Sequence, residues 1–336
     1  MHNFKITRIF LHTLVSAALL LPSAAFVSCS DNEKPADSYD VYDISDGVSQ
    51  PDTDSSESAY DKPDMFDVSP IVEAYRSGDS SKLSQLEKDI LDKAANVLDE
   101  IITDDMDDYA KELAVHDYLI INCTYDEGEL KAIPQPSENC DNPYGTLYNG
   151  QAICKGYTTT FRMFMGMLGI PCGTVHASDT DGDEHAWNTV KLDGSWYYVD
   201  CTWDDPVPDY DGRLVEHTYF NCSRELMEQR HILPDGTPET DSIKYSYNNQ
   251  SAVNISELSQ MYDAIESAAD NKADSAVLVF DDSLGLEFST HKDLLENPDF
   301  QNEIAKIDGG GKYIITRYQI AETEKGKALV LNFMTV

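Results

Sequence analysis

Residues 184–206 read EHAWNTVKLDGSWYYVDCTWDDP, and this stretch indicates how the chain is paired around a tight turn. Two runs rich in β-branched and aromatic residues, His185–Leu192 and Ser195–Thr202, flank the pair Asp193-Gly194. An Asp-Gly pair between two such runs favours a two-residue turn, because both turn residues tolerate a positive φ. The sequence therefore predicts an antiparallel hairpin.

The length of the turn also sets the register of the hairpin. With two turn residues, Leu192 pairs with Ser195, and the same count places Trp187 opposite Asp200 and His185 opposite Thr202. His185 and Asp200 are then diagonal neighbours on one face, with Cβ atoms roughly 7 Å apart. That separation allows an imidazole–carboxylate hydrogen bond, which would orient the imidazole and fix its tautomer.

The two faces of the hairpin differ in character. The face with His185 and Asp200 is the polar one. The opposite face is mostly apolar and should pack against the core; it carries Ala186, Asn188, Val190, Leu192, Tyr197, Val199 and Cys201.

A helix should precede the hairpin. Ile153, Tyr157, Phe161, Phe164, Met165 and Leu168 recur at steps of three and four, which is typical of one buried helical stripe. Gly169-Ile-Pro171 stops the helix, and Gly150 lies just ahead of it. Cys154 therefore falls in the first turn, where the helix dipole and a nearby imidazolium both lower the pKa of a thiol.

Together these residues predict a nucleophile, a base and an orienting carboxylate. The Cys154 thiolate would attack an amide carbonyl, and the Cys154 backbone N–H would help to bind the oxyanion. Tyr144 and Gln151 are two candidates for a second oxyanion donor. Each residue alone has a plainer interpretation, namely a core cysteine, a structural histidine and a turn-capping aspartate; the combination favours catalysis.

The same motifs resemble the core of bacterial transglutaminase-like proteins. The similar stretches are Gly150-Gln-Ala-Ile-Cys154-Lys-Gly-Tyr157, His185-Ala-Trp-Asn188 and Trp196-Tyr-Tyr-Val-Asp200-Cys-Thr-Trp-Asp-Asp-Pro206. His116-Asp-Tyr-Leu119 and Tyr219-Phe220 resemble flanking elements, so the resemblance covers roughly residues 85–230.

The resemblance implies an α+β, papain-like fold in which a helix bearing the cysteine packs on an antiparallel sheet. It implies Cys154, His185 and Asp200 as a catalytic triad acting through a thioester, as in cysteine peptidases and transglutaminases. The reaction stays open, because the superfamily also contains non-catalytic modules; a surface module that binds protein or glycan is the alternative. We expect a protein or peptide substrate and no cofactor.

Other candidates are weaker. Asp179-Thr-Asp-Gly-Asp-Glu184 hints at a calcium loop, but its glycine and glutamate fall at the wrong positions. His176 is a second candidate base without an apparent facing carboxylate. Trp203-Asp-Asp-Pro206 is most simply a strand-ending turn. Two features remain open: a disulfide between Cys123 and Cys140, and a substrate groove as opposed to ordinary packing for Trp187, Trp196 and Tyr198.

The rest of the chain divides into flanking units. Residues 68–122 have helical periodicity and 126–144 are loop-like, so the catalytic domain should span 66–245. Residues 250–336 predict a small accessory α+β domain with helices at 256–269 and 292–307 and strands at 276–280, 312–320 and 328–334.

The N-terminal residues predict export. Lys5 and Arg8 precede an apolar run over 9–21, and small residues follow it, as in a signal peptide. Val27-Ser-Cys29-Ser resembles a lipobox, so we expect residues 1–29 to direct lipidation of Cys29; plain secretion after Ala25 is the alternative. The protein would then be lipid-anchored on the outer face of the membrane, or secreted.

The charge of the chain limits its partners. Residues 30–65 hold 11 Asp or Glu and two Lys, and they predict an acidic, disordered tether that buries too little apolar surface to fold. The formal net charge of the whole chain is −37. A nucleic-acid partner is therefore not expected, because phosphate binding requires positive patches.

The lipobox generates a prediction about the mature N-terminus. Cys29 should be the first residue of the cell-bound protein and should carry lipid. Intact mass spectrometry of protein extracted from membranes measures this. A mature chain that begins at Phe26 without added mass would contradict it.

Overall fold

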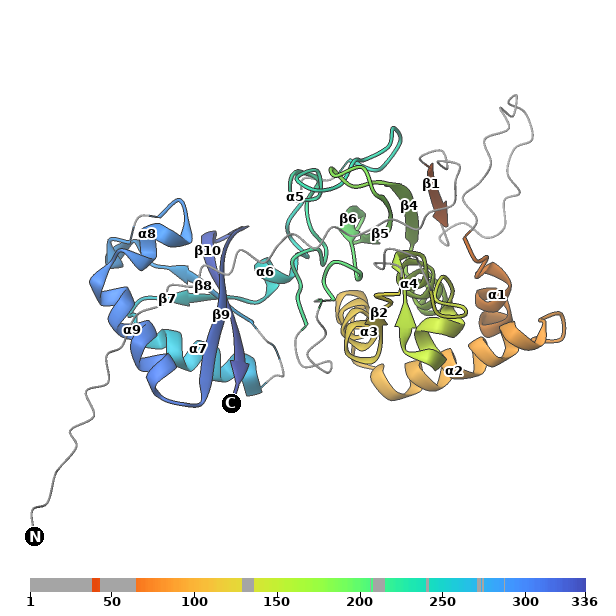
Figure 1. Ribbon diagram of the computed structural model, residues 1–336, viewed down its shortest axis with the longest axis horizontal. Coiled ribbons are helices and arrows are strands. Elements are labelled where there is room, and N and C mark those ends of the chain that lie inside the picture. The colour runs from red at the N-terminus through yellow and green to blue at the C-terminus, as the bar shows by residue number, and fades with distance from the viewer. Residues whose placement is uncertain are drawn as a thin grey trace, which may run out of the picture.

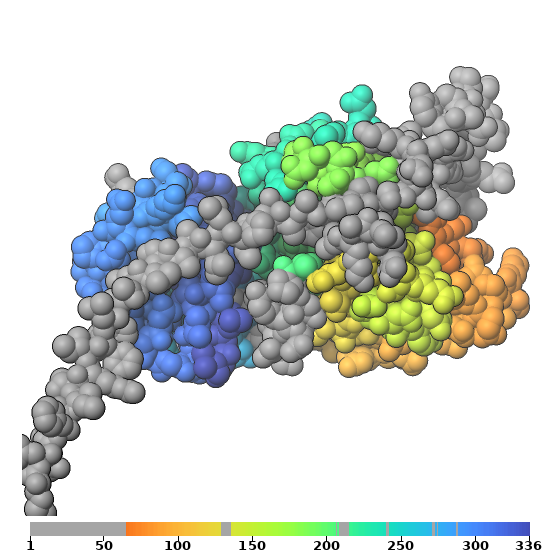
Figure 2. All heavy atoms as spheres, in the orientation of Figure 1, coloured from red at the N-terminus to blue at the C-terminus, as the bar shows by residue number. Residues whose placement is uncertain are grey.

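The computed structural model describes residues 65–128, 136–205, 207, 215–239, 242–270, 273, 275–286 and 288–336, and the backbone of 38–42. Two groups of elements lie side by side in Figure 1, with the sheets of each group next to its own helices. Figure 2 shows the same division on the surface, where the last residues of the chain form the blue part. The expected α+β class is confirmed.

Three helices open the first group, as the periodicity of 68–122 predicts. They are α1 (Ser69–Ser77), α2 (Gln85–Ile101) and α3 (Asp108–Asn122). Ser84 and Glu87 form a capping box at the start of α2, and the Asp107 side chain caps α3. These caps satisfy backbone N–H groups that an isolated helix end leaves without partners.

The cysteine-bearing helix is α4 (Cys154–Leu168), and Gly169 ends it in the left-handed conformation. Two short strands, β2 (Thr124–Tyr125) and β3 (Gln151–Ala152), pair in parallel just before it. A π-helical turn, η1 (Gly145–Asn149), precedes β3. A side chain at Gly156 would collide with the Cys140 carbonyl and with Ala152, so only glycine lets this loop pack against the start of α4.

The central sheet has the order β1-β4-β5-β6. Its strands are β4 (Cys172–Ser178), β5 (Glu184–Leu192) and β6 (Ser195–Val199), together with β1 (Ser38–Tyr42). The predicted register is confirmed, since Leu192 pairs with Ser195 and Asn188 with Val199. Asp193 and Gly194 have φ values of 49° and 84°, as the turn requires.

The strand β1 corrects the prediction of an unstructured tether at five positions. The backbone of Ser38–Tyr42 pairs antiparallel with β4, from Ser38 opposite His176 to Tyr42 opposite Cys172. Backbone hydrogen bonds to an open sheet edge need no hydrophobic core, so an acidic sequence can still supply an edge strand. Cys29 and the rest of residues 1–64 lie outside the described residues.

Different parts of the chain pack on the two faces of the hairpin. The apolar face joins the main core, with Val190, Tyr197 and Val199 packed beneath α4. The face with His185 is also covered for most of its length. Trp187 and Tyr198 are buried there against Cys222 and other residues that follow the hairpin, because the chain after β6 folds back over this face.

The segment after β6 is mostly irregular. It contains the short helices α5 (Arg224–Met227) and α6 (Tyr247–Gln250). The bridge between Tyr198 and Cys222 and the bridge between Asp179 and His231 attach it to the edges of the sheet. Across the described residues, no helix combines the length and the apolar character needed to cross a membrane.

The second group surrounds a separate core. Its sheet has the order β7-β8-β10-β9, from β7 (Ala252–Ile255), β8 (Ser275–Phe280), β9 (Tyr313–Thr323) and β10 (Gly326–Thr335). The helical elements are α7 (Gln260–Asp270), η2 (Asp282–Leu284), α8 (His291–Leu295) and α9 (Pro298–Gly309). The predicted pattern missed β7, and Asn297-Pro298 divides the helix expected over 292–307, since proline starts a new helix readily but cannot continue one.

Two tyrosines just after position 244, Tyr245 and Tyr247, pack with the first core. Tyr245 stacks on Tyr109 at 5.9 Å between ring centroids, and Tyr247 stacks on His217 at 3.8 Å. The expected domain boundary at residue 245 stays a prediction, but it passes through this aromatic cluster. A fragment of the first group should therefore continue to residue 251.

We predict that a fragment of residues 65–251 folds on its own and that a fragment of residues 65–244 is less stable. Losing both tyrosines removes buried aromatic area worth on the order of 2–4 kcal/mol. Urea unfolding of the two fragments, followed by circular dichroism, measures the difference. Equal midpoints, or failure of the longer fragment to fold, would contradict this assignment.

Candidate active site

The nucleophile candidate lies at the very start of α4. Cys154 is the first residue of the helix, and Ile153 ahead of it is extended, with φ −96° and ψ 177°. The Ile153 N–H donates to the Cys140 carbonyl at 2.9 Å, which ties the entry of the helix to the preceding loop. Cys154 thus occupies the position at which the helix dipole is most favourable to a thiolate.

The predicted histidine and carboxylate meet as the register requires. His185 Nε2 lies 2.7 Å from Asp200 Oδ2. Asp200 follows β6 directly, and its Oδ1 accepts the backbone N–H groups of Thr202 at 3.0 Å and Trp203 at 3.2 Å. The carboxylate is therefore held by the turn on one side and by the imidazole on the other.

The contact between His185 and Asp200 shifts the pKa values of both groups. Burial alone would lower the pKa of His185, but the charge and hydrogen bond of Asp200, with a further hydrogen bond to Cys154, raise it to about 10. Burial alone would raise the pKa of Asp200, but His185 and His231 hold it well below its ordinary value. Because Nε2 of His185 binds Asp200, Nδ1 is the nitrogen left for the thiol, and the geometry favours an imidazolium next to Cys154.

Aromatic rings enclose the imidazole. Trp203 stacks on His185 with 5.3 Å between ring centroids, and Trp187 lies 5.8 Å away on the same strand. The Arg230 guanidinium covers Trp203 at 5.2 Å. Trp187 and Tyr198 are thus packing residues, whereas Trp196 contacts Lys191. Trp203, which was expected only to begin a strand-ending turn, also supplies a ring that shields the histidine.

One residue of the site was missed by the sequence argument. His231 Nε2 lies 2.8 Å from Asp200 Oδ2, the same oxygen that binds His185. No motif surrounds His231, and it stands 31 positions after Asp200 in an irregular segment. The contact between His185 and Asp200 followed from the register of a hairpin. An irregular segment has no register, so its sequence does not predict which residue His231 contacts.

Buried polar groups support the turn after Asp200. Asp204 Oδ2 lies 3.2 Å from His116 Nε2, and Asp205 accepts a hydrogen bond from the Tyr157 hydroxyl. Burial would lower the pKa of His116, but Asp117 and Asp204 on its two nitrogens raise it to about 9. The resulting imidazolium connects α3 to the turn and provides the buried Asp204 carboxylate with a charged partner.

The remaining candidates have structural surroundings. The Gln151 side chain is exposed and accepts from Ser137 Oγ at 2.9 Å, and Tyr144 stacks on Tyr148 at 4.7 Å; the second oxyanion donor stays a prediction. His176 is buried in β4. Asp179 Oδ1 accepts the N–H groups of Asp181 and Asp183, so the acidic stretch forms a turn closed by its own carboxylate.

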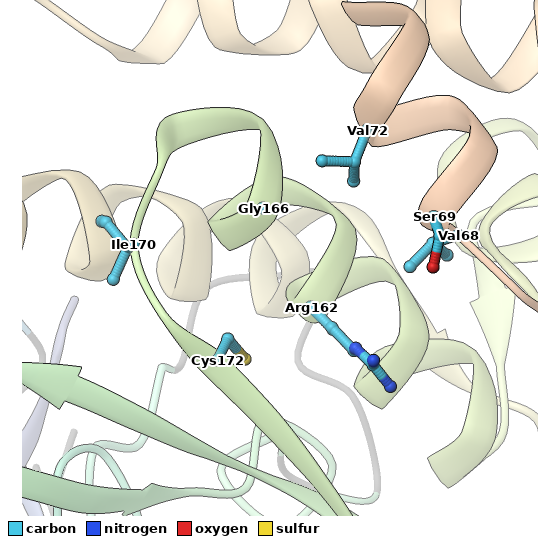
Figure 3. Close-up of a pocket in the computed structure, with 7 residues that line it drawn as sticks. All are labelled: Val68, Ser69, Val72, Arg162, Gly166, Ile170 and Cys172. Carbon is cyan, nitrogen blue, oxygen red and sulfur yellow. The ribbon is translucent and has the colours of Figure 1, made fainter. Parts of the chain in front are cut away.

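The described cysteines form no disulfide, and this includes Cys123 and Cys140, which are both buried. Burial raises the pKa of the Cys172, Cys201 and Cys222 thiols. Cys172 also lines a small hollow between α1 and α4, together with Val72, Gly166 and Arg162 (Figure 3). This hollow adjoins the C-terminal half of α4, at the other end of the helix from Cys154.

Among the described residues, two clusters have the spacing of a metal site. His185, Asp200 and His231 form one, and His116, Asp117 and His217 form the other, each with ligand atoms within 4.8 Å of one another. In both, nitrogen–oxygen distances of 2.7–3.0 Å place a proton between the atoms. A metal ion would need those lone pairs, so we interpret both clusters as hydrogen-bond networks.

Comparison with known proteins agrees with this geometry. Residues 95–201 match the family model of the Transglutaminase-like superfamily, and the expected fold class is confirmed. The match includes Cys154, His185 and Asp200.

Two curated relatives are kyphoscoliosis peptidases. The human protein is 29% identical over 128 residues, covering 34% of this chain and 19% of its own length. The mouse protein is 27% identical over 124 residues, covering 33% and 19%. The chain thus spans about a fifth of these relatives. Among solved structures, the crystal structure of a TGase has a TM-score of 0.32 at 18% identity and covers 55% of this chain and 45% of that chain.

A buried pair beneath the site generates a stability prediction. Glu112 Oε2 accepts from Asn221 Nδ2 at 3.0 Å, while Glu112 Oε1 and Asn221 Oδ1 are buried without a partner. Burial raises the pKa of Glu112 to about 8 although Asn221 lowers it. A protonated Glu112 is therefore favoured in the folded state, and the associated stability is lost as the pH rises from about 4.5 through 8.

We predict that Glu112→Gln, which supplies a permanent N–H donor, raises the melting temperature over the wild type by roughly 2–5 °C at pH 8. At pH 5 the difference should nearly vanish. Thermal unfolding at both pH values measures it, with the exposed Glu73→Gln as the matched control. A gain that is equal at the two pH values would show that Glu112 does not titrate between them.

Proposed function

We propose that this protein is a thiol acyl-transfer enzyme that acts on protein or peptide amide bonds through a Cys154 thioester. The observation that carries the proposal is the 2.7 Å contact between His185 Nε2 and Asp200 Oδ2, with the other side of the imidazole toward Cys154 at the start of α4. The match to the transglutaminase-like superfamily over these residues supports it.

Acylation would begin from the thiolate–imidazolium pair. Cys154 Sγ attacks the amide carbonyl, and the developing oxyanion is stabilised by the Cys154 N–H and a second donor, with Tyr144 and Gln151 as candidates. His185 Nδ1 gives its proton to the leaving nitrogen as the C–N bond breaks. The products of this step are an amine and a Cys154 thioester.

In deacylation the same histidine acts as a general base. Neutral His185 accepts a proton from the incoming nucleophile, which attacks the thioester and releases Cys154. With water as the acceptor, the product is a carboxylic acid and the enzyme is a peptidase or amidase. With an amine, the product is a new amide and the enzyme is a transglutaminase. We favour water, because it is always present.

The location and partners belong to the same proposal. An exported, lipid-anchored or secreted enzyme would meet substrates of the cell envelope or the extracellular space. The net charge of −37 would disfavour strongly anionic polymers as substrates.

The triad generates the main functional prediction. Cys154→Ala or His185→Ala should abolish acyl transfer, and Asp200→Asn should leave weak activity, because it removes the orienting charge and keeps the shape. A panel of fluorogenic peptide amides, assayed with and without a labelled primary amine, measures hydrolysis and transamidation separately. The activity should fall at alkaline pH as His185 loses its proton, since its raised pKa places the imidazolium state below about 10.

Alkylation provides the control that separates an enzyme from a binding module. Iodoacetamide should label Cys154 rapidly and with a pH dependence that His185→Ala removes. Cys172, Cys201 and Cys222 should stay unlabelled in the folded protein, because burial raises the pKa of each thiol. A Cys154 as inert as these three would favour the non-catalytic module.

A further inference from the structure

We propose that His231 is a positioning residue of the triad. Its imidazole binds the same carboxylate oxygen as His185, orients Asp200 and weakens the electrostatic attraction between Asp200 and the His185 imidazolium. The proposal rests on the proposed function for its catalytic consequence, but the hydrogen bond that carries it is observed independently. His231 Nε2 and His185 Nε2 lie 2.8 and 2.7 Å from Asp200 Oδ2.

The backbone around His231 is held in place by the central sheet. Ile232 N–H donates to Ser178 at 2.9 Å, Thr180 N–H donates to Arg230 at 2.9 Å, and His231 itself bridges to Asp179. This segment therefore extends the pairing beyond the end of β4. The imidazole therefore reaches Asp200 from a segment whose backbone is hydrogen-bonded to the sheet on both sides of His231, and this anchoring favours a fixed orientation.

The imidazole of His231 is completely enclosed. Its side chain has 0% exposure, and Trp203 and Trp187 lie 4.3 and 4.8 Å from it between ring centroids. Burying a polar ring is unfavourable unless its nitrogens are bonded. Nε2 lies 2.8 Å from Asp200 Oδ2, and Nδ1 faces the Met227 carbonyl at 3.2 Å. Both partners are acceptors, and burial lowers the pKa of His231, so the neutral ring has one N–H, which on Nε2 donates to the carboxylate.

Sharing one oxygen has a chemical consequence. Asp200 Oδ1 accepts two backbone N–H groups, and Oδ2 accepts both imidazoles. Each added donor stabilises the carboxylate and weakens its attraction for the proton of His185. The His185 imidazolium can then release its proton to a leaving amine more readily than it would if Asp200 were bonded to His185 alone.

The two nitrogens of His231 allow a matched pair of substitutions. The amide nitrogen of glutamine reaches the position of Nε2, whereas that of asparagine reaches the position of Nδ1. If the contact with Asp200 matters, His231→Gln should behave like the wild type and His231→Asn should not. If His231 only anchors its loop through Met227, the order should be reversed.

The test uses the full chain with isotopically labelled histidine, and His185→Gln identifies the resonance of His185. We expect the titration midpoint of His185 to rise by roughly half to one pH unit in His231→Asn, and to stay within about 0.2 of the wild type in His231→Gln. An unchanged midpoint in His231→Asn, or the reverse order, would overturn the proposal. Because this measurement needs no turnover, it decides the role of His231 even if the protein has no activity.

Kinetics then test the catalytic consequence. His231→Asn should lower kcat by about 10-fold with little change in KM, and His231→Gln should recover most of the loss, since the residue acts on the histidine and touches no substrate. Should the wild type itself show neither turnover nor reactive Cys154, the proposed function fails, while the titration still reports on the shared carboxylate. A loss confined to KM would contradict a positioning role.

Discussion

The site depends on one carboxylate that is bonded at both oxygens. Asp200 binds the turn through Oδ1 and two imidazoles through Oδ2. A buried carboxylate without such partners would take up a proton and lose its charge. The hairpin, the turn after it and the segment that carries His231 therefore have to converge on Asp200, and the rings of Trp187 and Trp203 close the space around it.

A second layer of charge holds this arrangement from below. His116 is bonded to Asp117 and Asp204, and His217 is bonded to the same oxygen of Asp117. Removal of one member of such a network would leave a buried charge without a partner, which costs more than the pair gains by forming. His217 of this network also stacks on Tyr247, which lies in α6, just before the second group of elements begins. The connection between the two groups therefore starts at the residues that support the site.

Packing around α4 shows how the fold accommodates the candidate nucleophile at the start of this helix. Gly156 admits the Cys140 carbonyl at the start of the helix, and Gly166 admits Val72 of α1 farther along. The helix can therefore be buried over most of its length while its first residue stays beside the histidine. Cys172, Cys201 and Cys222, by contrast, lie in the apolar interior, where the neutral form of a thiol is favoured.

Local chemistry in the sequence determined the hairpin, its register and the position of Cys154. An Asp-Gly turn leaves no choice of pairing, and a stripe at helical spacing places the cysteine in a first turn. Three features depend on long-range packing: the polar face is covered, residues 38–42 add an edge strand, and His231 binds the same carboxylate as His185. These contacts join irregular or distant segments, and nothing periodic in such segments reports where they will fold. The helix and hairpin follow from interactions between near neighbours, whereas the second histidine follows from the path of a loop, which only the packing of the whole domain selects.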